Sequence, residues 1–141
     1  GQVFRHVLTR TVTETDNLLV TTLTMNTQLL HLDAEFAKEH SVTGKILVNS
    51  MFTLALVVGI SVSDVTNGTT VGNLGFKEVT FPAPVSIGDT IRVETEVLGK
   101  RESKSRPSNG IVEFEHRGYN QKGELVAKVH RLAMMMKAPG G

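Results

Sequence analysis

The chain has 141 residues and a mass of 15.3 kDa, which fits a single domain over residues 1–141. Lys and Arg total 15 against 14 Asp and Glu, so the charge balance favours neither a nucleic-acid partner nor an acidic membrane. Cysteine is absent, which excludes disulfide frameworks, zinc–thiolate sites and a cysteine nucleophile. The most apolar stretch, residues 46–60, is shorter than the roughly 20 residues of a membrane span. No secretion signal is recognised, and we expect a cytoplasmic protein.

The first half of the chain predicts one strand followed by short helices. Apolar and polar residues alternate loosely over residues 3–12, as they do in a strand. Threonines and acids at residues 13–16 can begin a helix, which we expect over residues 17–25. After a polar passage, Asp33 can cap a second short helix over residues 34–37.

Residues 51–60 predict a buried central helix that begins at Asn49 and Ser50. Apolar side chains fall on nearly every face of this helix, so it must be covered nearly all round. The β-branched content leaves a buried strand as the alternative for residues 56–60. The apolar run is long for a strand, which favours the helix.

Beyond residue 70 the apolar residues recur with a period of two, which predicts extended strands. We expect strands over residues 73–81, 90–98, 110–119 and 124–136, with a hairpin turn at residues 120–123. Four such strands predict an antiparallel meander. A long curved sheet wrapped around one apolar helix accommodates both patterns, and the predicted fold class is therefore α+β, with the hot-dog architecture.

Motif searches exclude several kinds of site. The sequence contains neither HxH nor HExxH and no carboxylate cluster with ligand spacing, so we expect no metal. It also lacks the glycine-rich phosphate loops and the GxSxG motif of serine hydrolases.

His31 is the candidate base, because it lies among three leucines that disfavour its charged form. The alternative is a hydrogen-bonded structural histidine. At Asn49 and Ser50 the first backbone N–H groups of the central helix lack intrahelical partners, and the helix dipole favours negative charge there. Such a site can receive a thioester oxygen that becomes an enolate. The alternative is that Asn49 only caps the helix.

Four segments of the chain form a recognisable set of motifs. They are Asn26-Thr-Gln-Leu-Leu-His31-Leu-Asp33, the segment from Gly44 to Leu54, Phe81-Pro-Ala-Pro-Val85 with Gly88-Asp89, and Asn120-Gln-Lys-Gly-Glu-Leu-Val126. Together they resemble the motifs of the MaoC-like (R)-specific enoyl-CoA hydratases. The similarity covers nearly the whole chain, and the sequence is most similar to the mesaconyl-CoA hydratase (β-methylmalyl-CoA dehydratase) branch.

The resemblance implies a hot-dog lyase that adds water reversibly to the double bond of an α,β-unsaturated acyl-CoA. It makes His31 the residue that activates water, and Ser50, with Asn49, the oxyanion hole. The family's usual aspartate is Asn26 here, and its Asn-Pro pair is Gln28-Leu29, with Gln28 a candidate substrate-binding residue. Asn26 either orients the water or only pins the loop backbone.

The resemblance also implies a homodimer at least, with the acyl-CoA substrate in a tunnel near the subunit boundary and no cofactor beyond the coenzyme A of the substrate. A cluster of basic residues either contacts the coenzyme A phosphates or forms a solvated hairpin tip. These residues are Lys100, Arg101, Lys104 and Arg106.

Two rival functions are open at this stage. The first is a hot-dog thioesterase, which places an acidic residue on the central helix. Between Asn49 and Ser63 there is neither Asp nor Glu, which counts against it. The second is a non-catalytic acyl-CoA-binding dimer, and Asn26 in place of the aspartate favours it.

Overall fold

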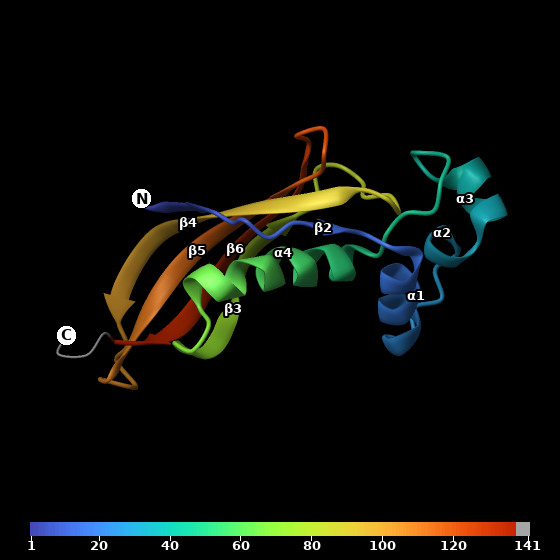
Figure 1. Cartoon of the computed structure of the whole chain (residues 1–141). Coiled ribbons are helices and arrows are strands. Elements are labelled where there is room, and N and C mark those ends of the chain that lie inside the picture. The colour runs from blue at the N-terminus through green and yellow to red at the C-terminus, as the bar shows by residue number, and fades with distance from the viewer. Residues whose placement is uncertain (138–141) are drawn as a thin grey trace.

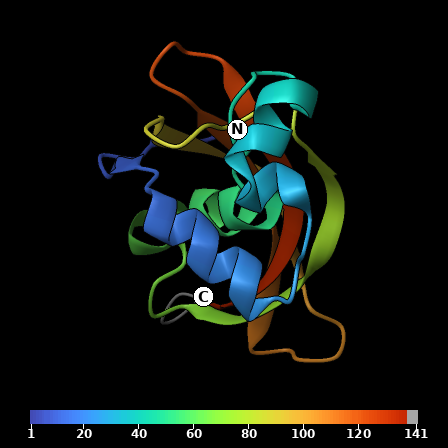
Figure 2. The same cartoon turned by 90° about the vertical axis from the view of Figure 1, so that its right-hand side faces the viewer.

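A computed structural model describes residues 1–137, in which a curved sheet of six strands lies over one long helix, α4 (Figure 1). Three shorter helices gather at one end of the sheet (Figures 1 and 2). This arrangement confirms the predicted α+β hot-dog fold. The elements are β1 (Val3–Arg5), β2 (Arg10–Thr11), α1 (Glu14–Leu23), α2 (Leu29–Leu32), α3 (Ala34–His40), α4 (Ser50–Val65), β3 (Thr70–Thr80), β4 (Thr90–Glu102), β5 (Asn109–Tyr119) and β6 (Leu125–Met136).

The sheet is antiparallel with the strand order β1-β4-β5-β6-β3. Strands β4, β5 and β6 form the predicted meander, but the prediction that β3 continues it next to β4 is wrong. Strand β3 pairs with β6, with Thr80 opposite Lys128. The link at residues 81–89 is too long for a tight hairpin, and its prolines Pro82 and Pro84 cannot donate ladder hydrogen bonds. The link runs from β3, at one edge of the sheet, across to β4, and it passes beside the beginning of α4, where the Val48 N–H donates to the Val85 carbonyl.

The predicted N-terminal strand over residues 3–12 is interrupted. Strands β1 and β2 both pair with β4, with a break between them at residues 6–9. At the break His6 turns inward and is 7% exposed, whereas Val7 is 92% exposed. The buried imidazole of His6 forms hydrogen bonds with Thr95 on β4 and with Asp64 on α4, and these bonds override the alternating pattern.

Helix α1 begins at Glu14, before the predicted start at residue 17, because Thr13 is its N-cap. Thr13 Oγ1 accepts a hydrogen bond from the Asp16 N–H at 3.2 Å, and Asp16 Oδ2 accepts one from the Thr13 N–H at 2.8 Å. This reciprocal pair is a capping box. Helix α3 begins as predicted, with Asp33 Oδ1 accepting from the Phe36 N–H at 2.9 Å.

The predicted central helix is α4, and it contacts the sheet closely. A Cβ atom added to Gly118 on β5 would lie 2.6 Å from a methyl carbon of Val57, so only glycine allows this approach. The opposite face of α4 is less covered than the sequence predicts, since Met51 and Val62 are 52% and 38% exposed. Within residues 1–137, no helix has the length and apolar character needed to cross a bilayer.

Candidate active site

A pocket of about 350 Å³ opens where α4 begins, between α2 and the link that joins β3 to β4. Most of its wall is apolar, including Val48, Val85 and Val126. Three polar residues interrupt this wall: His31 from α2, and Ser50 and Thr53 from the first turns of α4. The pocket therefore combines an apolar cavity with a few convergent polar groups, which is typical of small-molecule sites.

The backbone of Leu47 fixes the orientation of His31. The ring Nδ1 lies 2.7 Å from the Leu47 carbonyl oxygen, and the Leu47 N–H donates to the Leu30 carbonyl at 3.0 Å. Because a carbonyl oxygen only accepts, the His31 proton is on Nδ1. In the neutral ring, Nε2 is then a free acceptor that can take a proton from water.

The start of α4 leaves one backbone donor free. Asn49 Oδ1 accepts from the Met51 N–H at 2.9 Å, and the Asn49 carbonyl accepts from Phe52 and Thr53. The Asn49 N–H donates to Asn17 Oδ1. Among residues 1–137, the Ser50 N–H has no acceptor. Of the two predicted oxyanion-hole residues, Ser50 thus offers the available N–H, while Asn49 caps the helix.

Asn17 joins the two halves of the site, and no motif in the sequence pointed to it. Its side chain is buried in α1, where Nδ2 donates to the His31 carbonyl at 3.0 Å and Oδ1 accepts from the Asn49 N–H at 2.9 Å. Thr21, one turn further along α1, accepts from Asn49 Nδ2 at 3.2 Å. The one available signal was the pair of polar residues at i and i+4 of a helix, which equally fits a solvated face.

Asn26 and Gln28 lie beside the site but do not line the pocket. Asn26 Oδ1 accepts from the Gln28 N–H at 2.9 Å and so pins the turn before α2. Gln28 is the exposed N-cap of α2 and makes no side-chain cap. The water-orienting role of Asn26 and the substrate contact of Gln28 stay predictions.

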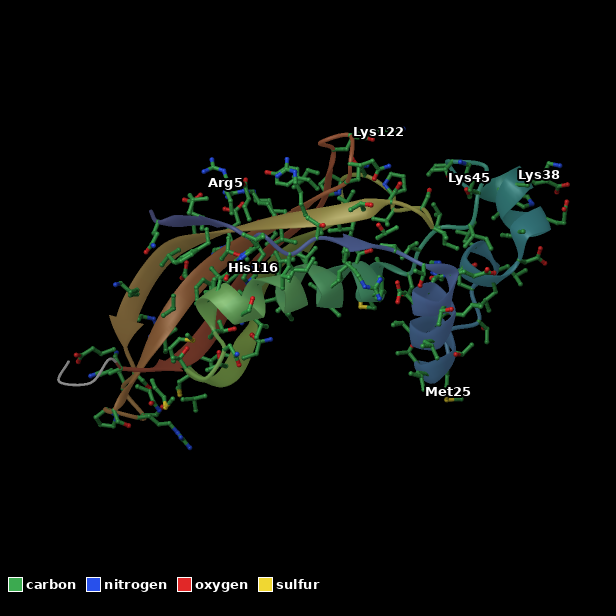
Figure 3. The ribbon with its side chains drawn as sticks, in the orientation of Figure 1. Arg5, Met25, Lys38, Lys45, His116 and Lys122 are labelled. Atoms are coloured by element: carbon green, nitrogen blue, oxygen red, sulfur yellow. The ribbon has the colours of Figure 1, made fainter. Side chains whose placement is uncertain are left out.

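The structure does not bring the predicted basic residues near His31. They lie at the hairpin between β4 and β5, at the end of the sheet opposite α2 (Figures 1 and 2). Two other lysines, Lys38 and Lys45, lie at the α2 end (Figure 3). Within residues 1–137 no three His, Asp or Glu side chains are placed to hold a metal ion. The distant basic residues are Lys100, Arg101, Lys104 and Arg106.

Known proteins show the same fold and related sequences. The family model of the MaoC-like domain matches residues 1–120. The mesaconyl-CoA hydratase of Cereibacter sphaeroides is 33% identical over 97% of this chain, which spans 39% of that protein. A monoamine oxidase regulatory protein from Archaeoglobus is 34% identical, with a TM-score of 0.88 over 99% of this chain and 91% of its own.

The (R)-hydratase PhaJ1 of Pseudomonas aeruginosa is 28% identical, with a TM-score of 0.76 over 98% of this chain and 82% of its own. The chain thus spans about two-fifths of the curated hydratase, whereas it spans 91% and 82% of the two solved structures. Because the family model covers most of the described sequence, from the first strand to the end of β5, the chain belongs to the MaoC-like domain family.

Proposed function

We propose that this domain adds water reversibly across the α,β double bond of an acyl-CoA thioester. The observation that carries the proposal is that His31 and Ser50 line one pocket, and that neither His31 Nε2 nor the Ser50 N–H has a partner among residues 1–137. Hydration of a conjugated thioester requires a base for water and a donor for the developing oxyanion. Membership of the MaoC-like family and the names of the related hydratases support the same reaction.

In the proposed mechanism the thioester oxygen accepts a hydrogen bond from the Ser50 N–H. His31 Nε2 takes a proton from water as the water oxygen bonds to the β carbon. The double-bond electrons move towards the thioester, whose oxygen becomes an enolate stabilised by Ser50 and the α4 dipole. The proton held by His31 then passes to the α carbon. Water is the only other reactant, so the mechanism uses no metal and no cofactor beyond the coenzyme A of the substrate.

For the acyl group we propose mesaconyl-CoA as the first substrate to test, since the curated relatives carry that name. We propose that the Asn26 amide orients the attacking water from beside the pocket through Nδ2, because its Oδ1 already accepts from the Gln28 N–H. The carboxylate of the substrate reduces the need for the second protein carboxylate that Asn26 has replaced.

We also propose that a second copy of the domain covers the exposed side of α4 and the free edge of the sheet. Strand β3 is a terminal strand of the sheet, and Leu74 and Phe76 on it are 49% and 45% exposed. Met51 and Val62 leave an apolar stripe on α4. An uncovered edge and an apolar stripe are both features that association buries. The expected mass in solution is at least that of two chains.

The test is to incubate the purified protein with mesaconyl-CoA or crotonyl-CoA and to follow the absorbance of the conjugated thioester. Hydration removes that absorbance without releasing thiol. Release of free coenzyme A, detected with a thiol reagent, would instead identify a thioesterase. Saturable binding of both thioesters with no change in either signal would identify a non-catalytic binding protein.

The two hydrogen bonds of the Asn17 side chain give a separate prediction. Asn17→Ala removes the donor to the His31 carbonyl and the acceptor for the Asn49 N–H, so the base and the oxyanion donor lose their fixed separation. We expect kcat/KM for hydration to fall about tenfold or more, and the free energy of unfolding to fall by about 1–3 kcal/mol. Steady-state rates and urea unfolding measure the two effects. Thr22→Ala, on the exposed side of α1, is the matched control, and equal rates for the two variants would contradict the prediction.

A further inference from the structure

Thr53 carries a hydroxyl, open to the pocket, that the proposed mechanism does not use. The residue is 3% exposed, yet it lines the pocket. Its hydroxyl makes no hydrogen bond to any of residues 1–137. Other helical threonines behave differently, since the hydroxyls of Thr22 and Thr24 donate to carbonyls one turn back at 2.7 and 2.6 Å. Every fully buried polar side-chain atom of residues 1–137 has a hydrogen-bond partner, so the unpartnered oxygen of Thr53 is open to the pocket and available to a bound molecule.

The position of Thr53 relative to Ser50 indicates which part of a substrate it meets. Residues i and i+3 lie on the same face of a helix, separated by a rise of about 4.5 Å at 1.5 Å per residue. Four atoms in a planar trans arrangement span about 3.8 Å, as Cα–C–N–Cα does across a trans peptide. In a trans enoyl thioester, the carbonyl carbon and the substituent on the β carbon are the ends of such a unit. With the thioester oxygen at the Ser50 N–H and the enoyl unit lying along α4, that substituent reaches the level of Thr53.

The surroundings of Thr53 favour a polar substituent over a methyl group. Val48, Val85 and Val126 make the nearby wall apolar, so a hydroxyl there gains nothing from an aliphatic group. The Ser50 hydroxyl is a second donor on the same face of α4 that has no partner among residues 1–137. Both hydroxyls lie in the first turns of α4, where the helix dipole favours negative charge. Two donors and this dipole suit a carboxylate.

We propose that Thr53 selects the substituent on the β carbon, and that the preferred substrates are trans enoyl thioesters with a carboxylate at that position. The Thr53 hydroxyl donates to one carboxylate oxygen, with the Ser50 hydroxyl beside it. This inference rests on the proposed hydratase function and adds a residue that determines specificity. Mesaconyl-CoA carries the required carboxylate, whereas crotonyl-CoA has a methyl group in its place.

The experiment compares the wild-type protein with Thr53→Val and Thr53→Ser on both substrates. Valine keeps the shape of the side chain and removes the donor, while serine keeps the donor. For Thr53→Val we expect kcat/KM to fall roughly 10- to 100-fold on mesaconyl-CoA and to stay equal or rise on crotonyl-CoA. Thr53→Ser is expected to keep the preference for mesaconyl-CoA. Because no group among residues 1–137 bonds the hydroxyl, Thr53→Val is expected to melt at the wild-type temperature or above it.

The outcomes separate this inference from the proposed function. If the wild-type protein hydrates both thioesters and Thr53→Val changes both rates by the same factor, the specificity role is overturned and the hydratase function stands. A wild-type preference for crotonyl-CoA also overturns it. If the wild-type protein hydrates neither thioester, the proposed function and the inference fall together. A lower melting temperature for Thr53→Val would show that the hydroxyl serves the fold rather than the substrate.

Discussion

Replacing His31 by alanine is expected to lower kcat for hydration by about 100-fold or more. The variant loses the Nε2 atom that takes the proton from water, and a positioned general base typically contributes at least that factor. The Leu47 carbonyl and the Ser50 N–H stay in place, so binding of the thioester is expected to change less than kcat. The absorbance assay with mesaconyl-CoA and crotonyl-CoA measures both parameters.

His40→Ala is the matched control for this variant. His40 lies on α3, a few residues along the chain, and its side chain is 56% exposed. It does not line the pocket, so hydration by this variant is expected to match that of the wild-type protein. If the His31 and His40 variants hydrate at the same rate, His31 is a structural histidine and the proposed mechanism is wrong.

The second large effect is expected from His116, which lies between the sheet and α4 (Figure 3). It belongs to a chain of hydrogen bonds that is buried as far as His6 and ends at the partly exposed Asp64, and the chain runs in one direction because the Arg131 guanidinium can only donate. Arg131 Nε donates to His116 Nε2 at 2.8 Å, and His116 Nδ1 donates to Thr95 Oγ1 at 2.7 Å. The Thr95 hydroxyl donates to His6 Nε2 at 2.8 Å, and His6 Nδ1 donates to Asp64 Oδ2 at 2.7 Å.

We expect His116→Phe to lower the free energy of unfolding by about 3 kcal/mol or more. Phenylalanine fits the space of the ring but removes the acceptor of Arg131, which is 3% exposed and would keep a buried charge without that partner. Urea unfolding measures the change. His130→Phe is the control, since His130 bonds Glu113 at a partly exposed position and is expected to cost about 1 kcal/mol or less. Equal losses for the two variants would contradict the prediction.

The same cluster makes the stability of the protein depend on pH. Burial, and then the positive charge of Arg131, lower the pKa of His116 to about 3. The unfolded chain therefore binds a proton at His116 near pH 6.5, which the folded chain does not bind until about pH 3. The stability from this group is complete above pH 6.5 and decreases as the pH falls towards 3, by about 1.4 kcal/mol per pH unit. His116→Phe is expected to remove this part of the slope.

Local patterns in the sequence predicted the elements well and their pairing less well. The apolar run of α4 and the alternation along β4, β5 and β6 are properties of neighbouring residues, and periodicity reports them directly. The pairing of β3 with β6 depends on where a link of several residues crosses the molecule. Nothing in the pattern of either strand specifies that choice.

The candidate site was likewise predictable only in part. His31 and Ser50 stand in a recognisable motif and at a helix start, and the structure places both on one pocket. Asn17 was missed because its role exists only when α1 packs beside Asn49, 32 residues further along the chain. Thr53 was missed because a threonine in an apolar helix usually bonds the carbonyl one turn back, and only the folded structure shows that this hydroxyl does not.

At Leu47 the main chain fixes the tautomer of His31, and the side chain shapes the cavity, so the two roles are independent. The atom that sets the protonated nitrogen of the imidazole is a main-chain oxygen, which every amino acid supplies at position 47. The leucine side chain there contributes to the cavity wall instead. Exchanging it for a smaller or larger aliphatic residue changes the room for the acyl group while the tautomer of the base persists. A substitution at position 47 can thus change which acyl groups fit the cavity while the catalytic residue His31 stays the same.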